Sequence, residues 1–244
     1  DKEKTMGVKD LKLAENLEEL AQKVDAIILA VKPQDFKTLL LNLRPLVRDK
    51  LLISIAAGVP TKFIEASLVN PRIIRVMPNL MVKVKRATTA LVYTKSTNKK
   101  DLKLAKKIFK LMGKTLILKE ELIDAFTVIA GSGPAFIYFL INGKSESEKK
   151  KIIKEKVIPT FYKVSLNLGF TPKQAKFLAK NIPKTSLIFL EKSGSSCEEL
   201  IKKIASKGGT TEAGLTVLEK DGSLEEAIQA GINRAKELAG IFST

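Results

Sequence analysis

Residues 25–34 read DAIILAVKPQ, a short apolar run that stops abruptly at Pro33. Four more apolar runs, rich in β-branched residues, follow it in the first half of the chain. They are residues 51–55, 72–76, 88–93 and 115–118. Amphipathic segments such as 16–23 and 100–112 separate the runs. Continuous apolar runs of this length indicate strands buried on both faces, so we predict a doubly wound α/β domain.

The second half has a different texture, because strand signals disappear from about Glu120 onward and long helical patterns replace them. Thr171-Pro172 supplies an N-cap followed by proline at the first helical position. Thr210 or Thr211 is expected to cap another helix after Gly208-Gly209. We predict an all-helical second domain, with domains spanning residues 1–120 and 121–244.

A highly charged stretch, Asn142 to Glu155, interrupts the helical half with three consecutive lysines and a Ser-Glu-Ser-Glu run. Two interpretations stay open for it: a solvated extension of a helix, or a mobile surface loop.

The residue inventory excludes several kinds of chemistry. Cys197 is the only cysteine and histidine is absent. Disulfides, multi-cysteine zinc sites and every mechanism with imidazole as base or ligand are therefore excluded, and no metal site is predicted. Catalysis must rest on hydroxyls, carboxylates, lysines, backbone amides or a bound cofactor.

The formal charge of +17 raises the question of a nucleic-acid partner. Lysine outnumbers arginine 37 to 6, the charges are scattered, and aromatic residues do not interleave with them. We therefore interpret the charge as a solvated lysine surface and expect no specific nucleic-acid binding.

The chain is expected to be cytoplasmic and to have no membrane partner. The nearly apolar run 129–141 is too short to span a bilayer. The segment from Asp1 to Thr5 is charged, and no apolar signal segment follows it.

Three segments place proline or small residues at the ends of predicted strands. They are Leu29 to Gln34, Ser54 to Pro60 and Arg75 to Asn79. In a doubly wound sheet the carboxyl ends of the strands face the ligand crevice, so these segments are candidates for cofactor contacts. Ordinary strand ends and tight turns explain each of them equally well when it is considered alone.

Two glycine-rich segments, 131–135 and 206–211, lead into predicted helices. Glycines followed by hydroxyl residues at a helix start expose backbone N–H groups, which suit a small carboxylate. The alternative is a glycine turn with a threonine cap.

The order and spacing of these segments resemble the pyrroline-5-carboxylate reductase family, from about Gly7 to Gly240. Six signature pieces carry the resemblance. They are Ala30-Val31-Lys32-Pro33, Ala56-Ala57-Gly58, Val76-Met77-Pro78-Asn79, Leu122-Ile123-Asp124-Ala125, Gly131-Ser132-Gly133-Pro134-Ala135, and Gly208-Gly209-Thr210-Thr211 with Gly214-Leu215.

The resemblance implies a Rossmann-like domain that binds NADP(H) or NAD(H). It also implies an all-α C-terminal dimerisation domain like that of 6-phosphogluconate dehydrogenase. The expected assembly is a homodimer, with further assembly as an alternative. The implied reaction is hydride transfer to 1-pyrroline-5-carboxylate, giving L-proline in the last step of proline biosynthesis.

Family positions also imply the site residues. Residues expected to line the cofactor crevice are Asn16, Ala30, Val31, Lys32, Pro33, Ile55, Ala56, Ala57 and Asn79. Residues expected to surround the substrate are Glu120, Ser206, Gly209, Thr210 and Thr211. The catalytic roles fall to Thr211, whose hydroxyl would sit against the ring nitrogen, and to Ser132 near the nicotinamide.

Departures from the family pattern leave two alternatives: a catalytically weak paralogue with a binding or regulatory role, and another two-domain dehydrogenase acting on a hydroxy acid or imine. Lys207 replaces a usual proline, and Lys203 stands where an asparagine often contacts substrate. The 244 residues contain no Gly-x-Gly-x-x-Gly loop. The family begins with a strand, that loop and a helix, so we expect the sequence upstream of Asp1 to supply them.

Overall fold

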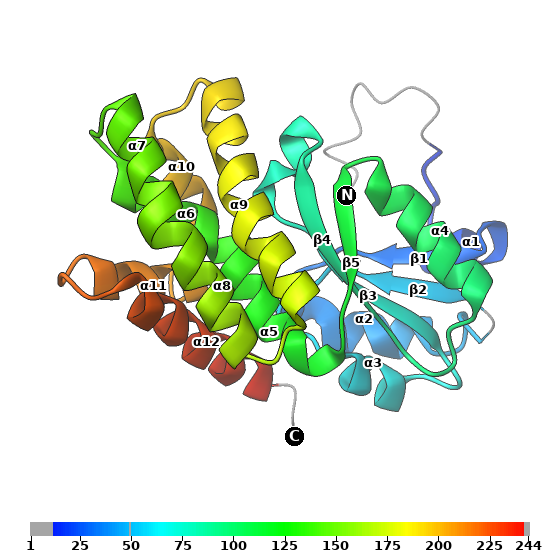
Figure 1. The fold of residues 1–244 in the computed structure, drawn as a ribbon. Helices are drawn as coiled ribbons and strands as arrows, with labels where there is room; N and C mark the ends of the chain where they lie inside the picture. The colour runs from blue at the N-terminus through cyan, green and yellow to red at the C-terminus, as the bar shows by residue number, and fades with distance from the viewer. Residues whose placement is uncertain (1–11, 49, 242–244) are drawn as a thin grey trace.

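The computed structural model describes residues 12–48 and 50–241 of the chain. A sheet with its flanking helices forms one region, and a cluster of helices forms the other (Figure 1). Gly7, where the family resemblance begins, lies outside the described residues.

Five strands form one sheet, in the order in which they occur along the chain. They are β1 (Ala26–Leu29), β2 (Leu51–Ser54), β3 (Arg72–Met77), β4 (Ala87–Tyr93) and β5 (Gly113–Ile117). Each lies on one of the five predicted apolar runs, so the prediction of an α/β sheet is confirmed.

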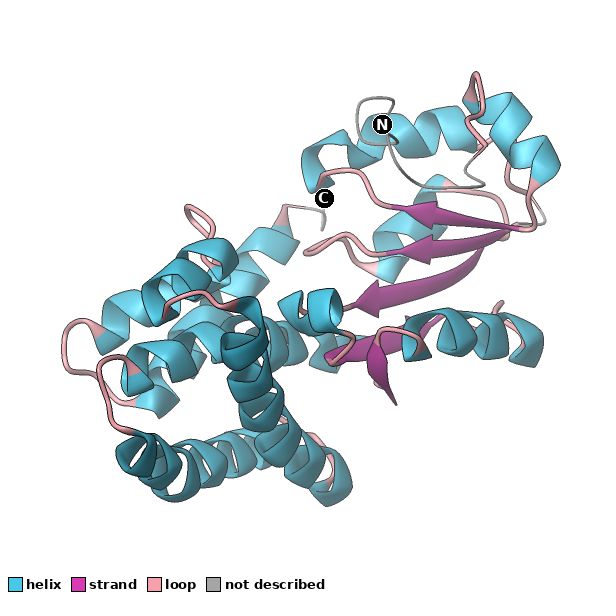
Figure 2. Ribbon diagram, turned by 90° about the horizontal axis from the view of Figure 1, so that it is seen from above, coloured by secondary structure: helices cyan, strands magenta, loops and turns pink. Residues whose placement is uncertain are grey.

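The sheet is mixed and not fully parallel, because β4 reverses the strand direction. β1, β2 and β3 are parallel, but β4 runs antiparallel to β3, and β5 is parallel to β4. The connection from β3 to β4 is too short for the crossover that parallel neighbours need, whereas the connection from β4 to β5 contains a helix. Arrowheads of the parallel strands point toward the helical region (Figure 2).

Helices cover both faces of the sheet, as a doubly wound domain requires (Figures 1 and 2). α1 (Leu17–Lys23), α2 (Phe36–Leu43) and α3 (Thr61–Ser67) pack on one face, and α4 (Lys99–Lys110) packs on the other. Neighbouring residues of β2 point to opposite faces, because Leu52 belongs to the first core and Leu51 and Ile53 belong to the second. Burial on both faces accounts for the continuously apolar strands.

Helices form the rest of the described chain. A 3₁₀ turn, η4 (Glu120–Leu122), leads into α5 (Ile123–Phe126), a π-helical segment η5 (Thr127–Ser132) and α6 (Gly133–Ile141). The others are α7 (Glu146–Ile152), the π segment η6 (Ile153–Val157), α8 (Ile158–Asn167), α9 (Pro172–Ser193), α10 (Cys197–Ile204), α11 (Thr210–Leu218) and α12 (Leu224–Gly240). Two short 3₁₀ helices, η2 (Pro33–Asp35) and η3 (Leu80–Val84), lie in the sheet region.

Two predicted helix caps have different outcomes. Thr171 caps α9 with a capping box to Gln174, as predicted. The expected threonine cap after Gly208 is wrong, because Gly209 occupies the N-cap position of α11 and no side chain caps it. Thr210 and Thr211 are already helical.

The charged stretch is helical, which decides between the two interpretations in favour of a helix extension. Ser145 starts α7 with a capping box to Glu148. The helix continues through η6 into α8, with Ile153 and Val157 buried in the core. Ile153 lies within the charged segment and Val157 just after it, so the helix has a packed face there, which a solvated loop would lack.

One helical stretch, Glu120–Ile141, is long and apolar enough to cross a membrane by length and composition alone. Within the described structure 72% of its most apolar window is buried inside the protein. Phe126, Phe136 and Tyr138 are among the largest fully buried side chains. The stretch therefore has the burial of a core helix.

The sheet region and the helical region share part of their core. Met81, Ala90 and Val92 belong to the sheet region but pack in the same apolar cluster as the helices. β5 ends at Ile117 and the helical stretch begins at Glu120, where dividing the chain into two domains remains our proposal.

Candidate active site

A cavity of about 360 Å³ lies between the ends of the first two strands and the helical region. Its lining residues are Pro33, Gln34, Ala57, Gly58, Asp124, Thr127, Ser206, Gly209, Thr210, Ala235, Leu238 and Ile241. Five of them were predicted as site residues from the sequence: Pro33, Ala57, Ser206, Gly209 and Thr210. The fold thus brings predicted cofactor residues and predicted substrate residues to one place.

Two strand ends form the sheet side of this cavity. β1 and β2 are parallel neighbours, so the segments that follow them emerge side by side, held by a bond from Ile55 N to Leu29 O of 3.1 Å. Pro33 opens the turn after β1. Gly58 adopts a left-handed φ of 74°, which lets the chain turn sharply after Ala57. The result is a wall of backbone and small side chains.

The remaining predicted cofactor residues do not line the cavity. Ala30, Val31 and Lys32 are exposed beyond β1, while Ile55 and Ala56 pack into the sheet cores. Asn16 serves as the N-cap of α1, where its side chain accepts a bond of 2.8 Å from Glu19 N. Cofactor contacts by these residues stay predictions.

Asn79 is buried and its amide is engaged within the protein. Its Nδ2 donates to Ala130 O at 2.9 Å, and its Oδ1 accepts from Thr88 N at 3.2 Å. It therefore ties the end of β3 to the π segment of the helical region. These bonds describe a residue that orients another segment of the protein, and a cofactor contact by Asn79 stays a prediction.

The loop before α11 forms the opposite wall. Gly208 has a φ of 69°, and its carbonyl accepts a bond of 2.7 Å from Arg234 Nε. Its N–H donates to Glu212 Oε2 at 2.6 Å, and Gly209 N donates to Ser206 O at 2.9 Å. These bonds hold the loop against α12. Because no side chain caps α11, the first amides of that helix remain available to an anion.

Three hydroxyls connect this loop to the π segment. Thr211 Oγ1 donates to Ser132 Oγ at 2.9 Å, and Ser132 Oγ lies 2.9 Å from Thr210 Oγ1. Ser132 is 1% exposed and Thr211 5% exposed, whereas Thr210 lines the cavity. The structure thus directs the Thr211 hydroxyl toward Ser132, and Thr210 is the threonine that faces the open space.

Glu120 lies outside this cavity. Its carboxylate forms an ion pair of 2.5 Å with Arg75 and accepts a bond of 3.0 Å from Thr61 Oγ1. The Arg75 side chain is 3% exposed and needs this partner, since an unpaired buried guanidinium is costly. The structure places Glu120, whose side chain is 30% exposed, in a part-buried polar network, whereas the sequence prediction placed it around the substrate.

Asp124 is the residue of the cavity that our assignment of roles missed. Burial raises the pKa of its carboxyl, and the nearby Glu120 raises it further, while Arg75 and Lys236 act in the opposite direction. The signal was present in the Leu122-Ile123-Asp124-Ala125 motif, which we used for the resemblance without giving Asp124 a role. The π segment that follows it is a second signal, because such segments often mark functional sites.

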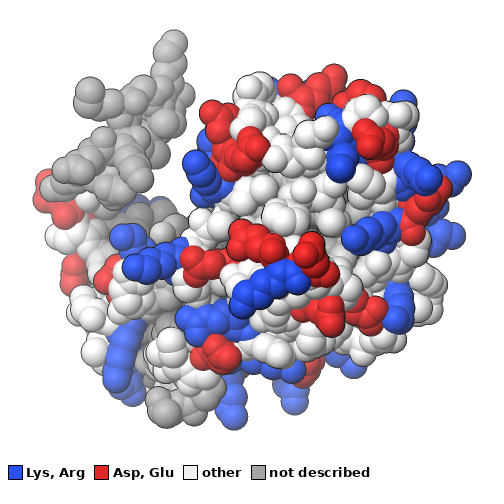
Figure 3. Space-filling model, turned by 90° about the vertical axis from the view of Figure 1, so that its left-hand side faces the viewer, with Lys and Arg blue, Asp and Glu red and all other residues white. Residues whose placement is uncertain are grey.

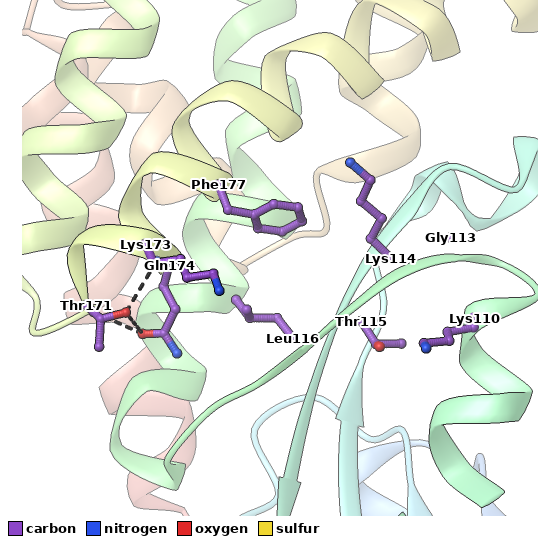
Figure 4. Close-up of a pocket in the computed structure, with 9 residues that line it drawn as sticks. All are labelled: Lys110, Gly113, Lys114, Thr115, Leu116, Thr171, Lys173, Gln174 and Phe177. Carbon is purple, nitrogen blue, oxygen red and sulfur yellow. Dashed lines mark hydrogen bonds between the residues drawn. The ribbon is translucent and has the colours of Figure 1, made fainter. Parts of the chain in front are cut away.

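A second, larger hollow of about 710 Å³ lies between β5 and α9 (Figure 4). Lys110, Lys114 and Lys173 line it, and Lys114 Nζ lies 5.4 Å from the centre of the Phe177 ring. No sequence-predicted site residue lines this groove. We therefore place the candidate site in the smaller cavity.

Charge on the face formed by the helical region is mixed (Figure 3). Positive and negative side chains are interspersed there, without a continuous basic stripe. On this face the pattern agrees with a solvated lysine surface.

Comparison with known proteins adds independent findings. The family described as pyrroline-5-carboxylate reductase dimerisation matches residues 120–238. The family described as NADP oxidoreductase, coenzyme F420-dependent, matches residues 3–58. A pyrroline-5-carboxylate reductase of Bacillus subtilis is 34% identical over 205 residues, covering 84% of this chain and 67% of that protein. One of Methanosarcina acetivorans is 33% identical over 224 residues, covering 90% and 77%.

The chain belongs to the pyrroline-5-carboxylate reductase family. A solved relative, the Plasmodium falciparum pyrroline carboxylate reductase with NADP bound, has a similar fold, with a TM-score of 0.56 and 29% identity over 91% of this chain and 80% of that one. The family assignment confirms the resemblance drawn from the six motifs and the two-part fold that it implied.

The two lysines that depart from the family pattern do not enter the cavity. Lys203 Nζ donates to Ser195 Oγ at 2.8 Å, away from the lining residues. Lys207 is exposed and is not a lining residue either. Neither substitution therefore introduces a charge into the cavity of this member of the family.

Proposed function

We propose that this chain reduces 1-pyrroline-5-carboxylate to L-proline, with NADPH or NADH as hydride donor. The observation that carries the proposal is the meeting of two sets of residues in one cavity. Pro33 and Ala57, expected beside the cofactor, face Ser206, Gly209 and Thr210, expected around the substrate. These segments are far apart in the chain, and their meeting in one cavity supports a shared site.

The wall made by Pro33, Ala57 and Gly58 suits the flat nicotinamide end of the cofactor, because small side chains let a ring approach the backbone. The bound dinucleotide would supply the hydride. The other cofactor residues predicted from the sequence remain part of the proposal as contacts farther along the dinucleotide.

The substrate carboxylate would bind at the uncapped start of α11. The helix dipole and the first amides favour an anion there, and Ser206 and Thr210 add hydroxyl donors at the rim. Ser132 and Thr211 would position Thr210 through the chain of hydroxyls. A cyclic imine needs alignment and exclusion of water more than a strong base, which agrees with a site without histidine.

We further propose that the enzyme works as a cytoplasmic homodimer. The family description that matches residues 120–238 is a dimerisation domain. The single thiol, Cys197, is free and buried, which agrees with a reducing compartment.

A kinetic assay that follows NADPH oxidation with 1-pyrroline-5-carboxylate tests the activity. We expect Thr210→Val to lower kcat/KM about tenfold to a thousandfold, the scale of one positioned hydrogen bond in a transition state. Thr216→Val is the matched control, because Thr216 is exposed on the same helix and bonds only Glu212 O. No turnover by the wild-type chain, with turnover of a hydroxy-acid substrate instead, would favour the alternative dehydrogenase.

A further inference from the structure

Asp124 is the only ionisable side chain among the described residues that line the cavity. The other polar lining side chains are the amide of Gln34 and the hydroxyls of Thr127, Ser206 and Thr210. None of these exchanges a proton readily near neutral pH. Within the described lining, any proton transfer from a protein side chain therefore falls to this carboxyl.

The Asp124 carboxyl also has no hydrogen-bond or ion-pair partner in the part of the chain that the structure describes. The charged groups that face it are Arg75 of β3, Glu120 of η4 and Lys236 of α12. Arg75 is already paired with Glu120 at 2.5 Å, so its charge is largely balanced. Asp124 is left with a free carboxyl beside the cavity.

The helical stretch presents this group to the cavity. Asp124 and Thr127 stand three residues apart, on one face of the helical stretch, and both line the cavity. Thr127 Oγ1 donates its proton to Ile123 O at 2.8 Å, so it has none to give to a ligand. Burial of the Asp124 carboxyl favours its protonated form, which is the form that a proton donor requires.

We infer that Asp124 donates the proton to the ring nitrogen of the imine, an inference that rests on the proposed function. The C=N π bond breaks, its carbon accepts hydride, and its nitrogen takes the proton of the Asp124 carboxyl. The product amine then takes a second proton from water. The resulting ammonium group pairs with the Asp124 carboxylate until release, after which water reprotonates the carboxylate.

A binding experiment without cofactor tests the contact. Titration calorimetry measures the binding affinity for L-proline and for cyclopentanecarboxylate. The second compound has the same ring size and carboxylate but no nitrogen. We expect Asp124→Asn to weaken L-proline binding at least about tenfold and to leave cyclopentanecarboxylate within twofold, because only the ammonium partner is lost. Glu121→Gln is the control, since Glu121 is exposed on the same segment and does not line this cavity. L-proline affinity within twofold of wild type in Asp124→Asn overturns the inference.

The pH profile supplies a second readout. Because the carboxyl must be protonated, kcat/KM of the wild type should fall as pH rises through the pKa of Asp124. Asp124→Asn should lose about a hundredfold or more in kcat/KM and should lack that descending limb. A variant that keeps the wild-type limb contradicts the proton-donor role, even if its rate is low.

The two proposals fail in different ways. A wild-type chain that neither oxidises NADPH with 1-pyrroline-5-carboxylate nor binds L-proline removes the proposed function and this inference together. A wild-type chain that does both, with Asp124→Asn unchanged in both, removes the inference alone. Circular dichroism of the variant confirms that a loss is not due to unfolding.

Discussion

The contact between the sheet and the helices has two sides that differ in how their polar groups are satisfied. On the closed side Asn79 bonds Ala130 O, and Asn181 Nδ2 donates to Thr88 Oγ1 at 2.8 Å. On the open side the cavity leaves the Asp124 carboxyl without a partner. The first side pairs its interface amides next to the groove between β5 and α9, and the second side leaves a carboxyl group unpaired.

This difference suggests that one side stabilises the arrangement of the two regions and the other side binds a ligand. Buried polar groups that are fully paired make an arrangement specific, so the closed side fixes how the helices sit on the sheet. A site for a polar substrate needs unpaired groups, which the open side supplies at a cost in stability. The Arg75–Glu120 pair, which also bonds Thr61, adds a further buried tie close to Asp124.

Breaking that tie should have the largest effect. Glu120→Gln leaves the buried Arg75 guanidinium without its counter-charge, so we expect the free energy of unfolding to fall by about 3 kcal/mol. Urea denaturation followed by circular dichroism measures it. Glu225→Gln is the control, because its pair with Lys163 is exposed and should contribute less than about 1 kcal/mol. Equal losses in the two variants would remove the distinction between a buried tie and a surface pair.

A change on the open side should alter function more than stability. A Cβ at Gly209 would overlap Ser206 Oγ and lie 3.0 Å from Ser206 O, which forces the loop before α11 to shift. We expect Gly209→Ala to lower kcat/KM about a hundredfold, because small misplacements of binding groups have effects of this size. Gly240→Ala, where a Cβ would meet nothing within 4 Å, is the control. Steady-state kinetics within twofold of wild type would mean that this loop does not bind substrate.

The closed side should respond to Asn181→Leu, which removes the donor to Thr88 and the acceptor for Lys114 Nζ at 3.1 Å. We expect a loss of about 1–2 kcal/mol in the free energy of unfolding, since the buried Thr88 hydroxyl loses its partner. Asn167→Leu, at the exposed end of α8, should change it by less than about 0.5 kcal/mol. Equal losses of stability in the two variants, measured by thermal unfolding, would show that the Asn181 bonds do not contribute to the free energy of unfolding.

The smallest effect is expected at Asp124, where ionisation of a partly buried carboxyl lowers the stability of the folded protein. Burial raises the pKa of Asp124 in the folded protein, so the stability linked to its proton is present at low pH and is lost as pH rises through that pKa. Asn is neutral at every pH, so Asp124→Asn should raise Tm relative to wild type, by an amount that grows as pH rises from about 4 through the raised pKa of Asp124. Calorimetric scans across this range measure it. A Tm difference that does not grow with pH would show that Asp124 ionises without penalty.

The sequence by itself determined the elements of this protein and its family. The five apolar runs became strands, the Thr171-Pro172 cap starts α9, and the order of the motifs led to the right family. These features depend on local pattern and spacing, because burial on both faces and helix capping act over a few residues. The division of predicted residues into a cofactor wall and a substrate loop also came from motifs alone.

Only the tertiary structure decided which side chains share the cavity. It turned the Thr211 hydroxyl toward Ser132, placed Glu120 in a part-buried network, and left the Asp124 carboxyl without a partner across the cavity from the loop before α11. The bonds that cause this join distant positions, such as Asn181 and Thr88, which are 93 residues apart. Such partners follow from how the helices pack on the sheet, and no local pattern along the chain records that packing.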